Sequence, residues 1–347
     1  MKAGIYDPYL DTLGGGEKYC LTLAELLLKN DFEVDIFWDG ENLKKKIKER
    51  LGVDIGKANF IPTSKGIIEK FINLRKYDLL FFMGDGSIPL MFGKRNVLHF
   101  QVPFKGIGGN SLLNKLKLRM IHHVICNSKF TQTIIEKEFK VKSEVIYPPV
   151  DIDKFKPGEK ENIILSVGRF SQLLQVKNQD ILIETFKELV DDGLKKWRLI
   201  LVGGSDVGGE SYVKRLRNIA RSYPIEIFEN VSVRELSKFY SKAKIFWAAN
   251  GYSVNEEIYP EKVEHFGITV VEAMSAGAIP ILVDKGGFRE IVVNEKSGFF
   301  WQTTKDLKKI TIELANEDLK KSSLEARKRS KLFAKEVFNE KFKKIIF

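Results

Sequence analysis

Short apolar segments alternate with amphipathic helical segments along the 347-residue chain, and this alternation limits the possible folds most strongly. The strand-like segments of the first half are Lys2–Ile5, Glu33–Trp38, Leu79–Met83, Asn96–Phe100 and Val124–Cys126. Helical segments such as Gly16–Leu28 and Lys129–Phe139 lie between them. Each strand is a nearly continuous apolar run, which is typical of parallel strands covered on both faces. The pattern predicts an α/β fold with a doubly wound sheet.

The alternation stops once and then starts again. Tyr147-Pro148-Pro149-Val150 cannot continue a helix or a central strand. The strand-like segments after this break are Ile163–Val167, Arg198–Val202, Ile225–Phe228, Ile245–Ala248 and Ile279–Val283. We therefore predict two Rossmann-like domains, residues 1–155 and 156–330, facing a central cleft. The amphipathic segment 331–347 is expected to cross back onto the first domain as a helix.

Composition excludes several classes of protein. No apolar run reaches the roughly 18 residues that a membrane-spanning helix needs. Cys20 and Cys126 give neither a disulfide framework nor a metal-binding spacing. The chain starts directly with a strand-like segment, so we expect no signal peptide and a cytoplasmic location. We also expect no metal site, because the carboxylates of Asp151-Ile152-Asp153 lie in the linker.

The net charge of +11 predicts a surface that attracts anions. A Lys-rich solvated surface without any ligand is the alternative interpretation. Nucleic acid is not an expected partner, because the sequence lacks interleaved basic and aromatic surface segments.

Three glycines follow the first strand and open a helix at Gly14-Gly15-Gly16-Glu17. Without side chains there, an anionic group can approach the backbone amides at a helix N-terminus. The segment is not a dinucleotide fingerprint, because Tyr19 stands where the third glycine belongs. A tight strand–helix turn without a ligand is the alternative.

Two cations follow the first strand of the second half. Arg169 lies in Gly168-Arg169-Phe170, and Lys177 comes eight positions later. A guanidinium and an ammonium at the carboxyl end of a strand suit a diphosphate. Two solvated cations are the alternative interpretation.

The segment from residue 264 to residue 274 is the densest candidate site. Its candidate residues are Glu264, His265, Phe266, Gly267, Ile268 and Glu272. A helix starts after the flexible Gly267, so its first N–H groups form an anion site. The two glutamates beside that site suit sugar and ribose hydroxyls better than phosphate. A charged loop with a helix-stabilising glutamate is the alternative.

His99 ends the strand-like segment Asn96–Phe100 and has two interpretations. A histidine at such a position is either a core residue or a catalytic group.

A basic amphipathic segment follows at residues 111–121. On a helix, Leu112, Leu113, Leu116 and Ile121 share one side, whereas Lys115 and Arg119 lie on another. Such a helix can lie in the headgroup region of an anionic membrane. A core-facing helix with a solvated basic face is the alternative.

Taken together, these motifs resemble those of the retaining GT-B glycosyltransferases of family 4, the glycosyl transferases group 1. The resemblance rests first on Glu264 and Glu272, two glutamates separated by seven residues, within Pro260–Gly277. Further matching motifs are Gly14–Glu17, Asn127–Thr131, Val145–Asp151, Gly168–Phe170 and Lys177. The stretch Ser171–Val176 is longer than is common in the family. The glycine loop and His265–Ile268 look closest to eukaryotic mannosyltransferases that extend lipid-linked oligosaccharides.

The resemblance implies a role for each matching residue. Arg169 and Lys177 would neutralise the departing diphosphate, Glu264 would contact the donor sugar, and Glu272 would hold the ribose. His99 would lie beside the reacting centre. The remaining residues implied in donor binding are Gly15, Gly16, His265, Phe266, Gly267 and Ile268.

The resemblance also implies the reaction. It is a retaining, metal-independent transfer of a hexose, with mannose from GDP-mannose as the first choice, to a glycan or polyprenol-linked acceptor. No cofactor is expected beyond the nucleotide diphosphate sugar. The enzyme would lie in the cytoplasm or peripherally on the inner face of the cell membrane. The alternatives are a transferase using UDP-glucose or UDP-GlcNAc on a soluble acceptor, a phosphorylase or sugar-nucleotide epimerase, and a non-enzymatic nucleotide-sugar binder.

Overall fold

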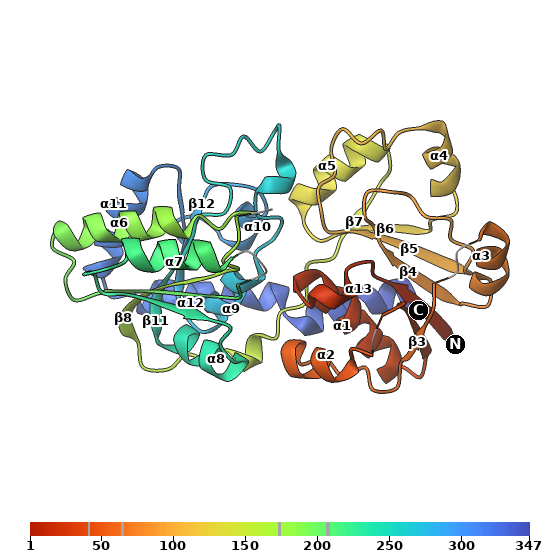
Figure 1. Cartoon of the computed structure of the whole chain (residues 1–347), viewed down its shortest axis with the longest axis horizontal. Coiled ribbons are helices and arrows are strands. Elements are labelled where there is room, and N and C mark those ends of the chain that lie inside the picture. The colour runs from red at the N-terminus through yellow and green to blue at the C-terminus, as the bar shows by residue number, and fades with distance from the viewer. Residues whose placement is uncertain (41, 64–65, 173–174, 206–208) are drawn as a thin grey trace. The chain divides into compact units, whose positions relative to one another are not determined.

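Two parallel β-sheets organise the chain in a computed structural model that describes residues 1–40, 42–63, 66–172, 175–205 and 209–347 (Figure 1). Within these residues, one sheet has seven strands in the order β3-β2-β1-β4-β5-β6-β7, and the other has six in the order β10-β9-β8-β11-β12-β13. All neighbouring strands pair in parallel. In both sheets the strand order reverses beside the first strand, which confirms the predicted doubly wound topology.

The chain divides into two compact units, here called unit 1 (Met1–Pro149 with Lys335–Phe347) and unit 2 (Val150–Ala334). These limits differ slightly from the expected ones at residues 155 and 330. The physical reason is that Val150 forms a parallel bridge with Ala334, so both crossing segments join unit 2 at the same place. In addition, Ser275 Oγ donates a hydrogen bond to the Phe155 carbonyl at 3.3 Å, which holds the start of unit 2 against the helix Ile268–Ser275 of the same unit.

Unit 1 contains the first seven strands and six helices of the described chain. The strands are β1 (Lys2–Tyr6), β2 (Glu33–Phe37), β3 (Asn59–Ile61), β4 (Leu79–Met83), β5 (Arg95–Phe100), β6 (His123–Cys126) and β7 (Glu144–Val145). The helices are α1 (Gly15–Lys29), α2 (Lys44–Leu51), α3 (Ile67–Leu74), α4 (Leu112–Leu118), α5 (Lys129–Phe139) and α13 (Lys335–Ile346). Figure 1 shows α1, α2 and α13 on one side of the sheet and α4 and α5 on the other.

Unit 2 repeats the same architecture. Its strands are β8 (Glu161–Val167), β9 (Arg198–Gly203), β10 (Ile225–Glu229), β11 (Ala243–Ala248), β12 (Ile279–Val283) and β13 (Phe299–Trp301). Its helices are α6 (Gln179–Asp191), α7 (Glu210–Ile219), α8 (Val233–Lys242), α9 (Ile268–Ser275), α10 (Phe288–Ile291), α11 (Thr304–Ala315) and α12 (Lys320–Ser330). Helix α6 contacts α7 and α11, whereas α9 contacts α8 and α12. The helices therefore form two layers around the sheet.

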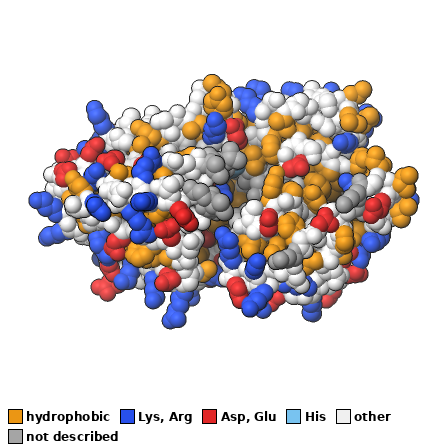
Figure 2. All heavy atoms as spheres, in the orientation of Figure 1, with side chains coloured by type: hydrophobic (Ala, Val, Ile, Leu, Met, Phe, Trp, Pro, Cys, Tyr) orange, Lys and Arg blue, Asp and Glu red, His pale blue; other side chains and the backbone are white. Residues whose placement is uncertain are grey.

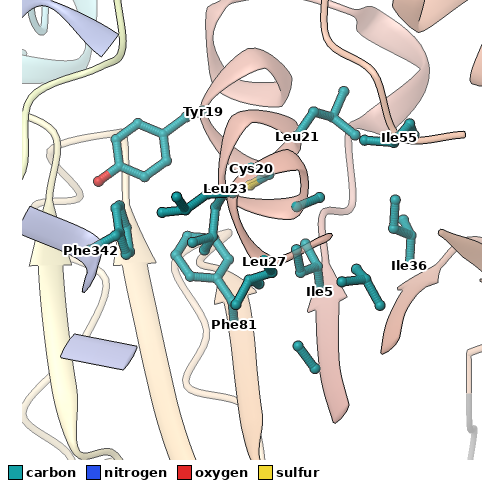
Figure 3. Close-up of a cluster of buried hydrophobic side chains, with 14 of the residues drawn as sticks. Ile5, Tyr19, Cys20, Leu21, Leu23, Leu27, Ile36, Ile55, Phe81 and Phe342 are labelled. Atoms are coloured by element: carbon teal, nitrogen blue, oxygen red, sulfur yellow. The ribbon is translucent and has the colours of Figure 1, made fainter. Parts of the chain in front are cut away.

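The main core of unit 1 lies between its sheet and α1 (Figure 3). Tyr19 and Leu27 of α1 are almost completely buried beside Ile5 and Phe81 of the sheet. Helix α13 covers Tyr19, whose ring meets Phe342 at a centroid distance of 5.9 Å. Burying a large apolar side chain stabilises a fold by about 1.5–3 kcal/mol, so this packing is what holds the C-terminal helix on unit 1.

Candidate nucleotide-sugar site

The loop after β8 holds both predicted cations at one sheet edge in unit 2. Arg169 directly follows Gly168 and is exposed. A side chain at Gly168 would place its Cβ 3.0 Å from Cγ of Lys177, so the lysine stem crosses the end of the strand at this glycine. The expected unusual stretch between the two cations includes residues 173 and 174, which lie outside the described residues.

Glu264 forms the charged centre of the site. Its Oε2 accepts a hydrogen bond from Lys177 Nζ at 3.0 Å and a second one from the Asn250 amide. The side chains of Glu264 and Lys177 are each 16% exposed, so water reaches the pair from one side. Burial would raise the pKa of Glu264, but the charge and hydrogen bond of Lys177, together with His265 and the Phe266 backbone, lower it overall. The glutamate is therefore a carboxylate at neutral pH.

A glycine pair that the sequence reasoning missed fixes the backbone directly after the Glu264 side chain. Gly286 and Gly287 follow β12, and the Gly287 amide donates to the Glu264 carbonyl at 2.8 Å. A Cβ at Gly286 would lie 2.3 Å from the same carbonyl oxygen, and a Cβ at Gly287 would lie 2.1 Å from that of His265. Only glycine permits this approach. Two glycines between a buried strand and a helix were the signal that could have revealed it.

The predicted helix N-terminus begins directly after this loop. Gly267 adopts φ 110°, a conformation that favours glycine, and α9 starts at Ile268 without a hydrogen bond from any capping side chain. Helix N-termini with uncapped amides attract anions. Next to this end, the Gln175 amide nitrogen lies 2.9 Å from Nδ1 of His265, and the Phe266 ring meets Phe333 edge-on. His265 and Phe266 are both buried.

Glu272 lies in the second turn of α9. It is 8% exposed, and its Oε2 accepts a hydrogen bond from the Tyr240 hydroxyl at 2.9 Å. Burial, together with the nearby Glu272 carboxylate, raises the pKa of Tyr240 well above its usual value, so the phenol keeps its proton and remains a donor. The sequence reasoning did not identify Tyr240, because a tyrosine on α8 gives no signal of contact with α9.

In unit 1, the predicted glycine loop begins α1. Glu17 accepts a hydrogen bond from the amide of Gly14, the residue that precedes the helix. The Gly16 carbonyl accepts a hydrogen bond from the Gln101 amide at 3.0 Å, and a Cβ on Gly16 would lie 2.6 Å from Gln101 Oε1. Gly15 is the first residue of the helix. The Gln101 side chain after β5 thus packs directly against Gly16, whether or not a ligand binds there.

His99 lies in the core of unit 1. It is fully buried, and its ring stacks on Tyr19 at a centroid distance of 3.9 Å. Neither ring nitrogen forms a hydrogen bond with the described residues. Burial lowers the pKa of His99 to about 3, against a weak opposite effect of the Ile125 backbone, so the imidazole is neutral. This position favours the core interpretation over a group that touches substrate.

Asp7, at the end of β1, is a buried carboxyl group that the sequence reasoning missed. It is 1% exposed, and its Oδ1 accepts the Tyr9 amide at 3.0 Å. Burial raises the pKa of Asp7 to about 7, and the charge of Glu17 adds to the effect. Asp7 and His99 both favour their neutral forms, so the strand ends of unit 1 differ electrostatically from those of unit 2.

The charged groups of unit 2 define what its sheet edge can do. An anionic group such as a diphosphate can bind to Arg169, Lys177 and the first amides of α9. Hydroxyl groups can donate hydrogen bonds to Glu264 and Glu272. The described residues contain no group of three or more His, Cys, Asp or Glu side chains placed to hold a metal ion. In the same part of the chain, no helix has the length and apolar character needed to cross a bilayer.

Comparison with known families agrees with this chemistry. The model of the family "Glycosyl transferases group 1" matches residues 149–334, more than half of the chain. A second model, "Glycosyltransferase Family 4", matches residues 13–154. The fold and the site therefore define a glycosyltransferase. The chain belongs to the glycosyl transferases group 1 family, as the sequence motifs predicted.

Two curated relatives are mannosyltransferases. The chain is 29% identical over 232 residues to the GDP-Man:Man(3)GlcNAc(2)-PP-Dol alpha-1,2-mannosyltransferase of Dictyostelium discoideum, which covers 61% of this chain and 44% of the relative. It is 27% identical over 249 residues to the alpha-1,3/1,6-mannosyltransferase ALG2 of Candida glabrata. This match covers 60% of this chain and 52% of the relative. The matches thus span about half the length of these relatives.

Solved structures of glycosyltransferases share the fold over nearly the whole chain. A glycosyltransferase from Rickettsia africae aligns with a TM-score of 0.80 at 18% identity and covers 99% of this chain and 97% of its own. Anabaena Alr3699/HepE in complex with UDP and glucose aligns with a TM-score of 0.69 at 19% identity, covering 99% and 98%. These similarities confirm the predicted GT-B fold.

Proposed function

We propose that the protein is a retaining, metal-independent hexosyltransferase that uses a nucleotide diphosphate sugar. The observation that carries the proposal is the Lys177–Glu264 pair of unit 2, at 3.0 Å. It brings a cation and an ionised carboxylate to the sheet edge that also carries Arg169. Family membership makes sugar transfer the chemistry that best uses these groups.

The cations act on the leaving group. When the bond between the sugar C1 and the phosphate oxygen breaks, its electron pair goes to the diphosphate, where negative charge grows. Arg169 and Lys177 would stabilise that charge, together with the amides at the start of α9. Because fixed cations already supply positive charge, the step requires no divalent metal in this proposal.

The two carboxylates take different parts. Glu264 would accept hydrogen bonds from the donor sugar and would keep Lys177 oriented before the diphosphate arrives. Glu272 would hold the ribose hydroxyls, with its carboxylate oriented by Tyr240. The acceptor hydroxyl would attack C1 on the face that the diphosphate leaves and pass its proton to the departing phosphate oxygen, so that the anomeric configuration is retained.

GDP-mannose is the donor we propose, and a polyprenol-linked glycan is the acceptor. The names of the Dictyostelium and Candida relatives support this choice. A UDP-hexose with a soluble acceptor is the second candidate, supported by the fold similarity to Anabaena Alr3699/HepE, which was solved in complex with UDP and glucose. Action in the cytoplasm, on the inner face of the cell membrane, follows from the first choice.

A panel of nucleotide sugars tests the proposal. The full chain is heated with GDP-mannose, UDP-glucose, UDP-GlcNAc and the free nucleotides, because a ligand that binds only the native state raises the melting temperature. The stabilising sugar is then supplied in labelled form with a dolichol-linked oligosaccharide. We expect GDP-mannose to stabilise the protein and its label to enter the lipid fraction with retained configuration by NMR. Stabilisation by UDP-sugars alone would support the second candidate. Absence of transfer from every donor would contradict the proposal that the protein is a hexosyltransferase.

A further inference from the structure

Two helices of unit 1 expose apolar faces. Helices α3 and α4 contain no buried residue, whereas each of the other α-helices in the described residues buries at least one. Both are nevertheless rich in large apolar side chains, as their sequences IIEKFINL and LLNKLKL show. Amphipathic surface helices normally bury such faces, so these two are exceptional.

Helix α3 presents its apolar face to solvent. The exposed fractions are 66% for Ile67, 75% for Ile68, 44% for Phe71 and 66% for Ile72. These positions follow one another at the spacing of a single helix face. Phe71 also stacks under the Arg75 guanidinium at 4.8 Å, which places a cation directly at the border of the apolar face.

Helix α4 repeats this combination. Leu112, Leu113 and Leu116 are 76%, 62% and 50% exposed, so these leucines do not face the core. The helix ends at Leu118, and Ile121 packs inward instead of extending the exposed face as the sequence suggested. Three leucines in seven residues therefore remain uncovered in the described chain.

The two helices pack on the same part of unit 1. Leu74 at the end of α3 and Ile121 just after α4 pack against the same core cluster, which consists of Phe37, Tyr77, Leu80 and Met91. The segment between β4 and β5 links them: Lys117 of α4 donates to the Ile88 carbonyl at 2.9 Å, and Phe71 of α3 meets Phe92 edge-on. Figure 2 shows hydrophobic side chains gathered where α3 and α4 lie, at the right of the view. We call this the α3–α4 surface.

The chain around α4 is mainly basic, although Glu138 of α5 accepts hydrogen bonds from amides of the loop before α4 and the exposed Glu69 lies on α3. From Gly86 to Ile135 the sequence contains no Asp or Glu, although it includes Lys94, Arg95, Lys105, Lys115, Lys117, Arg119 and Lys129. Lys115 and Arg119 are exposed and form no ion pair within the described residues. An apolar patch bordered by cations complements a layer with anionic headgroups above an apolar interior. A second copy of the same surface would instead bring like charges together.

We infer that unit 1 docks on an anionic lipid bilayer through the α3–α4 surface. The aliphatic side chains of both helices enter the headgroup boundary, and Lys115 and Arg119 contact the lipid phosphates. The inference rests on the proposed function for its purpose, because a membrane brings a lipid-linked acceptor to the enzyme. The binding itself requires neither donor nor turnover.

Vesicle co-sedimentation of the full chain tests the inference. Vesicles contain phosphatidylcholine alone or mixed with phosphatidylglycerol. We expect binding to the mixed vesicles, weak binding to the neutral ones, and weakening by salt. Each cation near an anionic surface contributes about fivefold to partitioning, so Lys115→Glu with Arg119→Glu should reduce it at least about tenfold. Ile68→Ser with Ile72→Ser should cause a similar loss by removing the inserted side chains.

Matched controls separate this surface from general charge and hydrophobicity. Lys45→Glu with Lys46→Glu changes the charge equally on α2, and Ile312→Ser with Leu324→Ser removes exposed aliphatics from unit 2. Both controls should keep wild-type binding. Equal binding to both kinds of vesicle, or equal loss in surface and control variants, would overturn the inference.

Two further readouts make failure specific. Light scattering without vesicles measures the oligomeric state of the wild type and of the Ile68→Ser, Ile72→Ser variant. If the wild type is a dimer, the variant is a monomer and neither binds vesicles, the surface serves self-association and the inference is overturned. Transfer activity is followed separately with a detergent-solubilised acceptor. Vesicle binding without transfer would refute the proposed function alone, and transfer without vesicle binding would refute the inference alone.

Discussion

Unit 1 and unit 2 have the same doubly wound architecture but use their charges in different places. In unit 2, Arg169 and the Lys177–Glu264 pair lie where strands end, and the carboxylate is ionised. In unit 1, strand ends hold Asp7 and His99, whose burial favours their neutral forms. Exposed cations of unit 1 include Lys115 and Arg119 of the segment around α4. The fold alone therefore does not locate the chemistry, whereas the side chains at the strand ends do.

The largest expected effect comes from the charged centre of unit 2. Arg169→Ala should lower the rate of transfer about a hundredfold or more, because removing one group that stabilises developing charge costs about 3 kcal/mol. Glu264→Ala should cause a similar loss, because it removes the contact to the donor sugar and the carboxylate that orients Lys177. Steady-state rates with the preferred donor provide the measurement, and circular dichroism checks the fold. Glu226→Gln, which removes an exposed carboxylate paired with Arg198 in the same unit, is the matched control. Near-wild-type rates in either site variant would refute the assignment.

The second prediction contrasts two titrations within unit 1. His99 has a folded pKa of about 3, below its unfolded value of 6.5, so the folded state loses stability as the pH falls below that value. Asp7 has a folded pKa of about 7, above its unfolded value of 3.8, so the folded state gains stability as the pH falls through 7. Between about pH 7 and pH 5, each effect amounts to about 2 kcal/mol with opposite sign.

Urea denaturation of two variants separates these effects. Relative to wild type, His99→Phe should gain about 2 kcal/mol of unfolding free energy on going from about pH 7 to pH 5, because the unfavourable protonation is gone. Asp7→Asn should lose about the same amount over that range. Parallel pH profiles for the wild type and both variants would show that neither group is buried in its neutral form.

The third prediction distinguishes the proposed role of Glu272 in nucleotide binding from the role of Glu264 in the transfer step. Glu272→Ala should weaken nucleotide binding about tenfold while changing the rate at saturating donor much less, because the proposed contact is to the ribose, away from the breaking bond. Tyr240→Phe should weaken binding by a smaller factor, since it removes only the hydrogen bond that orients Glu272. Isothermal titration with the nucleoside diphosphate measures both. Unchanged affinity in Glu272→Ala would contradict the ribose role.

The smallest expected effect is that of chelation. Because Arg169 and Lys177 supply the positive charge in the proposal, turnover should be the same with excess EDTA as without it. Rates are measured with EDTA and then after addition of Mg²⁺ or Mn²⁺. Activity that disappears with EDTA and returns only with the metal would contradict the metal-independent step.

Strands with longer apolar runs could be predicted from the sequence, including the edge strand β10, but the shortest edge strands could not. β4 and β12 have the expected bounds because their apolar runs are buried on both faces. The missed strands β3, β7 and β13 all lie at sheet edges and have only two or three residues. A segment this short contains too little periodicity to indicate a strand.

The residues of the site were predictable more fully than their contacts. The motif reasoning singled out Glu264 and Lys177, but their mutual hydrogen bond depends on the path of the loop after β8. Asn250 was missed because a single asparagine after a strand has no distinctive pattern. His99 shows the opposite limit: its position at a strand end suggested the active centre, whereas the packing of Tyr19 over its ring decides that it is buried. Such contacts arise from tertiary packing, which sequence spacing does not specify.

One paired binding measurement tests the contrast between the units most directly. Affinity for GDP and for anionic vesicles is measured on the same three proteins: wild type, Arg169→Ala, and Lys115→Glu with Arg119→Glu. We predict that Arg169→Ala loses about tenfold or more in GDP affinity and keeps vesicle binding, because a charge-assisted hydrogen bond contributes about 1.5–3 kcal/mol. The α4 variant should show the reverse. Loss of GDP affinity in the α4 variant, or none in Arg169→Ala, would contradict the placement of donor binding in unit 2.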